Sequence, residues 1–143
     1  MLSNSSKYAI KGVLYLAMKS STEKKILAKE LSVPINVPPS YIAKLLQELG
    51  KHGIVSSTKG PKGGFYLNEA NRIIPLIKIV DVIDGGYRLK SCMLSLSDCN
   101  EDHPCPLHKM VGNTKSNFVK QLQETTVNDL VADIKAGNSF LPL

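Results

Sequence analysis

The chain has 143 residues, of which 43% are hydrophobic, and it carries a formal net charge of +6. A chain of this length can bury one core of ordinary size with an extension, which excludes two large independent domains. No run approaches the ~20 apolar residues of a membrane helix, and residues 1–7 lack the segments of a signal peptide, so we expect a cytoplasmic protein without a membrane partner.

The first half of the chain predicts three helices, over residues 6–18, over residues 26–31, and from residue 40 to a glycine at 50 or 53. Ser5 or Ser6 is the expected N-cap of the first helix, and Pro34 is expected to break the second helix. Pro38 and Pro39 introduce the third helix. The inner face of this third helix carries Ile42, Leu45, Leu46 and Leu49.

A β-hairpin is predicted directly after the third helix. Two short strand-like runs, residues 54–57 and 64–67, are joined by residues 58–63, which are rich in glycine, proline and lysine. Three helices followed by a basic hairpin have the order of a winged helix. A fourth helix is expected over residues 75–83, closed by Gly85 and Gly86.

The second half of the chain predicts one long helix over residues 105–124 and a last helix over residues 127–135, capped by Thr126. At ~1.5 Å per residue the long helix spans about 30 Å, more than a compact winged helix needs for its own core. We therefore expect it to pack on the same helix of a second subunit and form a homodimer; packing on its own domain is the alternative. Its apolar stripe consists of Leu107, Val111, Phe118 and Leu122.

Three cysteines, Cys92, Cys99 and Cys105, lie within 14 residues, in and beside a predicted loop over residues 87–104. They are too few and too odd in number for the disulfide framework of a secreted protein. In a cytosolic chain, such clustering indicates a metal or redox site.

His108 follows Cys105 by three residues, so both side chains are expected on one face of the start of the long helix. Three thiolates and one imidazole can hold a [2Fe–2S] cluster, because histidine can replace cysteine on one iron. A closed zinc site is an alternative, although its cysteines usually come in pairs two to four residues apart. Reactive thiols or a reversible disulfide are another, and His103 is a second candidate for the fourth ligand.

Several runs of residues together match the pattern of a known family. They are Tyr-Ala-Ile at 8–10, Ser-Tyr-Ile at 40–42, Gly-Pro-Lys-Gly-Gly-Phe-Tyr-Leu at 60–67, and the set Cys92, Cys99, Cys105 and His108. With these runs the chain resembles the Rrf2 family over residues 7–133. The resemblance implies DNA-binding homodimers with a long dimerisation helix. Within that family the chain is most similar to the iron–sulfur cluster regulators and their nitric-oxide-sensing relatives, and the resemblance favours His108 as the fourth ligand.

The chain departs from that family pattern in two places. Lys62 stands in the wing where many members carry another glycine, which adds charge and removes some backbone freedom. A nitric-oxide-sensing subgroup draws one cluster ligand from an acidic residue in the first helix, and residues 6–9 here contain no carboxylate.

Candidate DNA contacts come from three places, the first helix, the third helix and the hairpin tip. Ser40, Tyr41 and Lys44 lie on the outer face of the third helix, where a recognition helix meets base edges. The hairpin tip combines two cations with a tight turn that suits a minor groove or phosphates. These tip residues are Lys59, Gly60, Pro61 and Lys62. Lys7, near the start of the first helix, is expected to contact phosphate.

The distribution of charge supports a nucleic-acid partner. Residues 1–75 hold 11 Lys and Arg against 4 Asp and Glu, whereas residues 76–143 hold 7 against 8. An excess of cations in one half suits a polyanion, because lysines at a phosphate backbone release condensed counterions. The alternative for the charge excess is a soluble lysine-rich surface. The alternatives are a solvated helix face for the third helix and an ordinary charged turn for the hairpin tip.

The expected fold is mainly α with a small β wing, namely a winged helix-turn-helix with a long C-terminal dimerisation helix. Residues 1–86 would bind double-stranded DNA, residues 87–104 would form the cluster-binding loop, and residues 105–143 would hold the dimerisation and C-terminal helices. The expected function is a transcriptional regulator that senses iron–sulfur status, redox state or nitric oxide through a [2Fe–2S] cluster held by the three cysteines and one histidine. A metal-binding or thiol-switch adaptor that acts through protein partners is the alternative. No orienting third group accompanies the cysteines and histidine, so we expect no enzyme.

Overall fold

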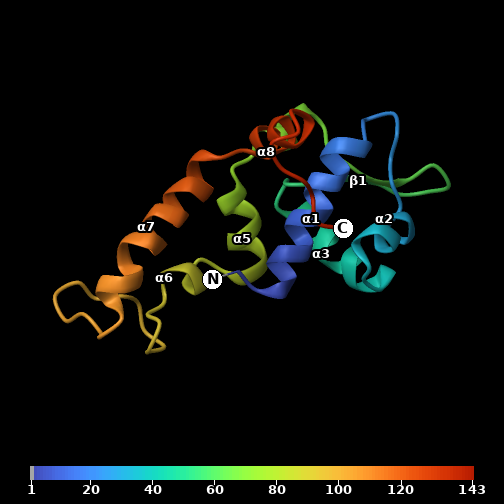
Figure 1. The fold of residues 1–143 in the computed structure, drawn as a ribbon. Coiled ribbons are helices and arrows are strands. Elements are labelled where there is room, and N and C mark those ends of the chain that lie inside the picture. Colours follow the sequence, from blue (N-terminus) through green and yellow to red (C-terminus); the bar gives the residue numbers. More distant parts are fainter. Residues whose placement is uncertain (1) are drawn as a thin grey trace.

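A computed structural model describes residues 2–143 and confirms the predicted fold class, helices with a two-stranded wing (Figure 1). The elements are, in chain order, α1 (Asn4–Lys19), α2 (Ala28–Ile35), α3 (Pro39–Lys51), β1 (Ser56–Thr58), β2 (Gly64–Tyr66), α4 (Glu69–Arg72), α5 (Leu76–Asp84), α6 (Tyr87–Lys90), α7 (His108–Glu124) and α8 (Val127–Lys135). Within residues 2–143, no helix is both long enough and apolar enough to cross a membrane.

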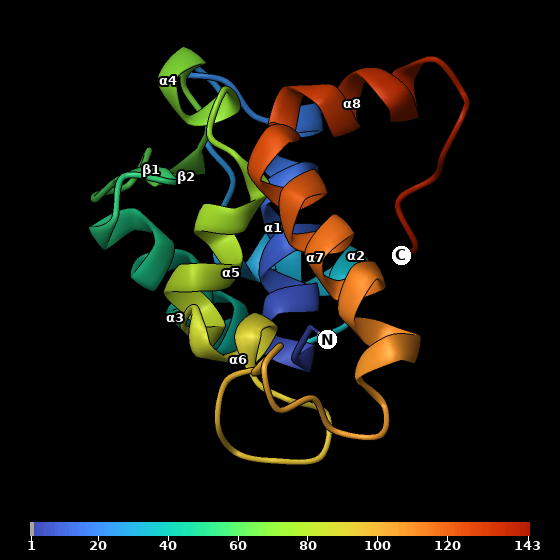
Figure 2. The same cartoon turned by 90° about the vertical axis from the view of Figure 1, so that its left-hand side faces the viewer.

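Helix α1 forms the centre of the core. It packs against α2, α3, α5 and α8, and α5 in turn packs against α7, on the far side of α5 from α1 (Figure 1). Figure 2 shows the same elements turned by 90°. Its inward side chains Ala9, Val13 and Leu16 have no exposed surface. Gly12 lets α3 approach closely, since a Cβ there would lie 3.3 Å from a terminal methyl of Ile42.

Two details of the first helices differ from the prediction. The N-cap of α1 is Ser3, whose hydroxyl accepts from the Ser6 amide at 3.0 Å, so the helix begins earlier than Ser5 or Ser6 would allow. Pro34 lies inside α2 and does not break it. Only one backbone hydrogen bond is lost to the proline so near the helix end, and Asn36 then ends α2 in a left-handed conformation (φ 60°).

The wing is an antiparallel pair that gains a third partner from the segment before α2. Ser57 pairs with Phe65 across β1 and β2, and Phe65 also exchanges two backbone hydrogen bonds with Ile26, at 2.8 and 2.9 Å. A Cβ at Gly64 would lie 2.9 Å from the Ile26 carbonyl oxygen, and one at Gly63 would overlap the Thr58 carbonyl oxygen. The two glycines therefore allow three chain segments to meet at the base of the wing.

The first strand starts two residues later than predicted, because Ile54 and Val55 turn into the core with 2% and 3% of their surface exposed. A buried amide then fixes the base of the wing. The side chain of Asn71 accepts a hydrogen bond from the Ser56 hydroxyl at 2.8 Å and donates one to the Gly53 carbonyl at 2.9 Å. The end of α3, β1 and α4 are thus held by one residue.

Arg72, the next residue along, closes the C-terminal end of α1. Its guanidinium donates to the carbonyls of Ala17 and Ser20, at 2.7 and 3.1 Å. Carbonyls at the end of a helix lack intrahelical partners and carry partial negative charge, so an arginine there is stabilising.

The C-terminal half matches the prediction at α8 and differs at the start of α7. Thr126 caps α8, and its hydroxyl accepts from the Asp129 amide at 3.2 Å in a capping box. Helix α7 begins at His108, so Cys105 lies before it rather than in its first turn. The reason is that Cys105 precedes Pro106, and a residue before proline is disfavoured in the helical conformation. The predicted loop over residues 87–104 also contains the single turn α6.

Candidate DNA interface and cysteine site

Helix α3 exposes two of its three predicted DNA contacts. Ser40 and Lys44 are exposed and lie one turn apart on the same face. Tyr41 differs from the prediction of a free side chain, because it is half-buried and its hydroxyl lies 2.9 Å from the Ser5 hydroxyl in a hydrogen bond. Its ring also meets Tyr8 edge-on, with centroids 5.9 Å apart. Tyr41 therefore holds the start of α3 against α1.

The wing tip presents its predicted residues to solvent. Lys59, Gly60, Pro61 and Lys62 are all exposed. A backbone hydrogen bond of 2.9 Å from the Gly63 amide to the Gly60 carbonyl closes the turn, and Gly60 takes a positive φ of 102°. The turn thus holds two lysines at the end of a short, rigid hairpin. Lys7 is exposed on α1.

The cysteine loop occupies the opposite end of the fold from the wing (Figure 1). All three cysteines are free and half-buried. The loop folds back on itself, because the Cys92 amide donates to the Ser97 carbonyl at 2.8 Å and the Cys99 amide donates to the Lys90 carbonyl at 3.2 Å. Cys99 is thereby returned to the end of α6.

Cys92 is the cysteine whose acidity is altered. The backbone amide of Leu94 donates to its sulfur at 3.4 Å, and together with a side-chain hydrogen bond from Cys105 this lowers the pKa of the Cys92 thiol to about 7. A thiol with such a pKa is substantially ionised near neutral pH, and thiolates are the form that binds metals. The structure therefore brings Cys92 and Cys105 together.

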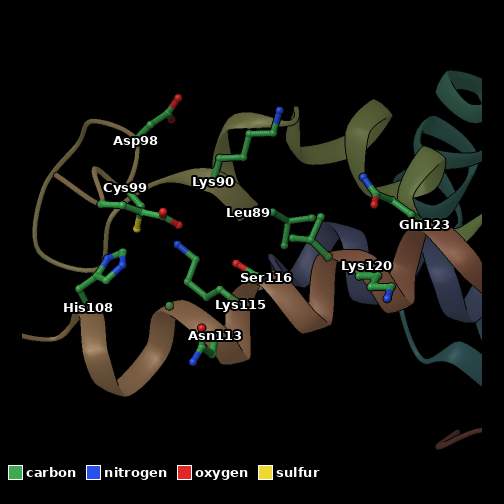
Figure 3. A pocket seen from close by; sticks show the side chains of 13 residues that line it. Leu89, Lys90, Asp98, Cys99, His108, Asn113, Lys115, Ser116, Lys120 and Gln123 are labelled. Carbon is green, nitrogen blue, oxygen red and sulfur yellow. The ribbon is translucent and has the colours of Figure 1, made fainter. Parts of the chain in front are cut away.

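Cys99 and His108 face a different space. They line a cavity of about 430 Å³ between α6, the cysteine loop and α7 (Figure 3). A second cavity, of about 540 Å³, lies beside Cys92 and is lined by Asp84 and Tyr87. Among residues 2–143, no three His, Cys, Asp or Glu side chains are gathered closely enough to hold a metal ion. His103, the other candidate ligand, is exposed on the loop.

The donor set nevertheless suits an iron–sulfur cluster by its chemistry. Three free thiols and one imidazole lie in one short segment, and one of the thiols ionises readily. Cys105 is a neighbour of Cys92, whereas Cys99 and His108 line one cavity.

Sequence reasoning missed Lys115, which lines both cavities. Only 8% of its surface is exposed, and its ammonium donates to the Ser91 carbonyl. The signal in the sequence was a lysine at the helical spacing of the apolar stripe, between Val111 and Phe118.

Asp84, which lines the Cys92 cavity, reaches the N-terminus of α1. The Ser3 amide donates to its carboxylate at 3.1 Å, and the Ser3 hydroxyl donates to the other carboxylate oxygen. Burial by itself raises the pKa of this carboxyl, but the Ser3 hydrogen bonds and the charge of Arg88 outweigh it and hold the pKa below its ordinary value. Asp84 thus links the end of α5 to the helix that supports α3.

The predicted dimerisation stripe is partly covered by the chain's own core. Leu122 is buried, Phe118 is half-buried against the core, and Leu107 and Val111 keep part of their surface exposed. Met110, on a neighbouring face of α7, is 73% exposed. The N-terminal part of α7 therefore retains apolar surface.

Comparison with known proteins places this geometry in a family. The profile of the Rrf2 family, described as iron-dependent transcriptional regulators, matches residues 2–133. A putative HTH-type transcriptional regulator of Aquifex aeolicus is 30% identical over 92% of this chain and 91% of its own length. The HTH-type transcriptional regulator IscR of Klebsiella pneumoniae is 26% identical over 91% of this chain and 78% of its own length.

Solved structures share the fold. The global cysteine regulator CymR of B. subtilis superposes with a TM-score of 0.73 and 22% identity, covering 92% of this chain and 96% of its own. T. potens IscR superposes with a TM-score of 0.70 and 21% identity, over 98% of this chain and 92% of its own. The related proteins are regulators rather than enzymes, and the match spans nearly the whole sequence. The chain therefore belongs to the Rrf2 family of transcriptional regulators.

Proposed function

We propose that this regulator binds DNA as a homodimer and senses its signal through a [2Fe–2S] cluster. In each subunit α3 would enter a major groove with Ser40 and Lys44 toward base edges, while the wing tip meets a minor groove or phosphates. Tyr41 supports this contact by fixing α3 against α1. Apolar surface on α7 would pack against a second copy and set the spacing of two recognition helices.

Cys92, Cys99, Cys105 and His108 would hold the cluster. When bound, the cluster supplies one-electron redox chemistry and a target for nitric oxide, and its occupancy reports iron–sulfur supply. The chain's own residues bind and shield it: the loop carries Cys92 and Cys99, and the turn before α7 carries Cys105. To hold one cluster, Cys92 and Cys105 would have to lie closer to Cys99 and His108 than they do in this structure.

The observation that carries the proposal is the concentration of three free thiols and His108 at the start of α7 in a family described as iron-dependent. The test is anaerobic purification, followed by assays of iron and sulfide and a visible spectrum. Wild type should contain both elements, and each of Cys92→Ala, Cys99→Ala and Cys105→Ala should lose iron and visible absorbance. Stoichiometric zinc without iron or sulfide would show that the site is a structural zinc site.

A thiol switch is the second candidate, favoured by the pKa of about 7 at Cys92, which the Leu94 amide and the neighbouring Cys105 thiol lower. Hydrogen peroxide would take two electrons from the pair, leaving a disulfide and water. Mass spectrometry of the metal-free protein after peroxide treatment measures this directly. A disulfide between these two cysteines that changes DNA affinity, in protein that never takes up iron, would favour this candidate over the cluster.

The adaptor alternative predicts weak or no DNA binding. The DNA-binding proposal is supported instead by exposed side chains at the start of α3 and at the hairpin tip, where they are free to contact a duplex. These side chains are Ser40, Lys44, Lys59 and Lys62. Selection of bound duplexes from a random-sequence pool tests this point. Failure to enrich any sequence, with salt-independent recovery, would favour the adaptor.

A further inference from the structure

Lys115 is a buried charged side chain beside two cavities lined mostly by polar residues. It lies on the inner face of α7 with 8% of its surface exposed, and lysine is rarely buried to this extent unless its charge is paired. Its ammonium donates one hydrogen bond, to the Ser91 carbonyl. A lysine ammonium has three N–H donors, so two remain for other partners.

Asp98 and Glu101 line one of the cavities beside Lys115 and Asp84 lines the other, but within residues 2–143 no carboxylate lies within the 4.0 Å of an ion pair with the lysine ammonium. The ion pairs found in that part of the chain are Lys51–Glu48 at 3.5 Å and Lys120–Glu124 at 3.9 Å, and both are largely exposed. Water in the adjoining cavities can hydrate the Lys115 ammonium while they stay open. A group that displaces this water must supply negative charge in its place, because an unpaired buried ammonium is costly.

The position of Lys115 indicates what that group is. Its side chain lines both the cavity that contains Cys99 and His108 and the cavity that contains Cys92. Figure 3 shows it reaching from α7 toward Cys99, on the same side as His108. Lys115 is therefore shared by the cavity of Cys99 and His108 and the cavity of Cys92.

We propose that Lys115 is the buried counter-ion of the [2Fe–2S] cluster and donates hydrogen bonds to its sulfur atoms. This inference rests on the proposed function. Three thiolates outweigh the positive charge of the cluster core, so the loaded site is anionic, and one-electron reduction adds a further negative charge. A nearby ammonium stabilises the reduced form more than the oxidised form and so raises the reduction potential.

The experiment compares four proteins purified anaerobically: wild type, Lys115→Gln, Lys115→Arg and Lys120→Gln. Glutamine keeps an N–H donor for Ser91 without the charge, and arginine keeps the charge. Lys120 is the matched control, because it lines the same cavity from the same helix but its side chain is 66% exposed. Iron content, cluster midpoint potential and the melting temperature of each apoprotein are measured.

Lys115→Gln should lower the ratio of reduced to oxidised cluster at fixed potential about tenfold, a midpoint shift of about −59 mV for one electron. Lys115→Arg and Lys120→Gln should match wild type, and removal of a buried charge should leave the Lys115→Gln apoprotein at least as stable. If that variant does not fold, Lys115→Met, which fills similar space, replaces it. Loss of the cluster in Lys115→Gln but not in Lys115→Arg also supports the proposal.

Two results would overturn the inference, and they are distinguishable. If a cluster-loaded Lys115→Gln protein has the wild-type potential, or if Lys120→Gln shifts the potential equally, Lys115 is not the counter-ion, and the cluster proposal still stands. If wild-type protein contains neither iron nor sulfide, both the cluster proposal and the role of Lys115 as its counter-ion are wrong.

Discussion

Replacing both wing lysines should reduce the salt dependence of DNA binding by a calculable amount. Lys59 and Lys62 are exposed at the tip of a hairpin that Gly60 and Gly63 close, so each can neutralise one phosphate without rearrangement of the fold. Each phosphate neutralised contributes about −0.9 to the slope of log affinity against log salt. Lys59→Ala with Lys62→Ala should therefore make that slope shallower by about 1.8.

The change in slope can be measured as the affinity of wild type relative to that of the variant at two salt concentrations. Between about 50 and about 200 mM salt, a slope difference of about 1.8 changes the affinity ratio of wild type to variant about twelvefold, with the larger ratio at low salt. Fluorescence anisotropy with a labelled random-sequence duplex suffices, because the phosphate contribution does not depend on sequence. Both proteins should have the same melting temperature, since neither lysine packs against the core.

A matched control separates a local contact from net charge. Lys120→Ala with Lys135→Ala removes the same charge from α7 and α8, which carry no predicted DNA contact. This control should keep the wild-type slope. If the wing variant also keeps it, or if both variants lose the same amount, the assignment of the wing tip to phosphates is wrong.

Three further predictions concern stability and assembly. Phe118→Glu places a charge on the half-buried stripe of α7, and sedimentation should then show monomer or loss of fold; a well-folded dimer would place the interface elsewhere. Asp84 has a lowered pKa in the folded protein, so its contribution to stability is present above its ordinary pKa of 3.8 and lost as pH falls through the folded value. Asp84→Asn should therefore flatten the acid limb of the urea-unfolding stability curve, and an unchanged limb would contradict the Ser3 hydrogen bonds. In Gly64→Ala the new Cβ would lie 2.9 Å from the Ile26 carbonyl oxygen at a residue with φ 145°, so the free energy of unfolding should fall by on the order of 1–3 kcal/mol. Gly53→Ala, where φ is 73° but the space is open, should lower it less; thermal unfolding measures both.

The features that could be predicted from sequence are those with short-range causes. The capping box at Thr126 and Asp129 places both partners within three residues, and the start of α8 at Val127 was predicted correctly, with its end at about Lys135. The order of three helices and a basic hairpin likewise follows from periodicity and turn chemistry, which act over a few residues.

The features that were missed depend on partners distant in the chain. Arg72 reaches Ala17, 55 residues away, and Asn71 reaches Gly53, so neither role leaves a local pattern. Tyr41 was predicted to be free because its helix face is outward, whereas the Ser5 hydroxyl that binds it belongs to another helix. Pro106 is visible in the sequence and disfavours a helical Cys105, so the start of α7 could have been placed after Cys105, although not at His108 itself.

The attachment of α1 at both ends has a mechanical consequence. Asp84 holds its first turn through Ser3, and Arg72 holds its last turn through two carbonyls. Helix α1 spans about 24 Å at ~1.5 Å per residue, and it carries the Ser5 hydroxyl that anchors Tyr41. Ser3 and Ser5 both lie at the start of this one helix. The end of α5 and the first turn of α3 are therefore attached to the same end of α1, without a contact through the wing.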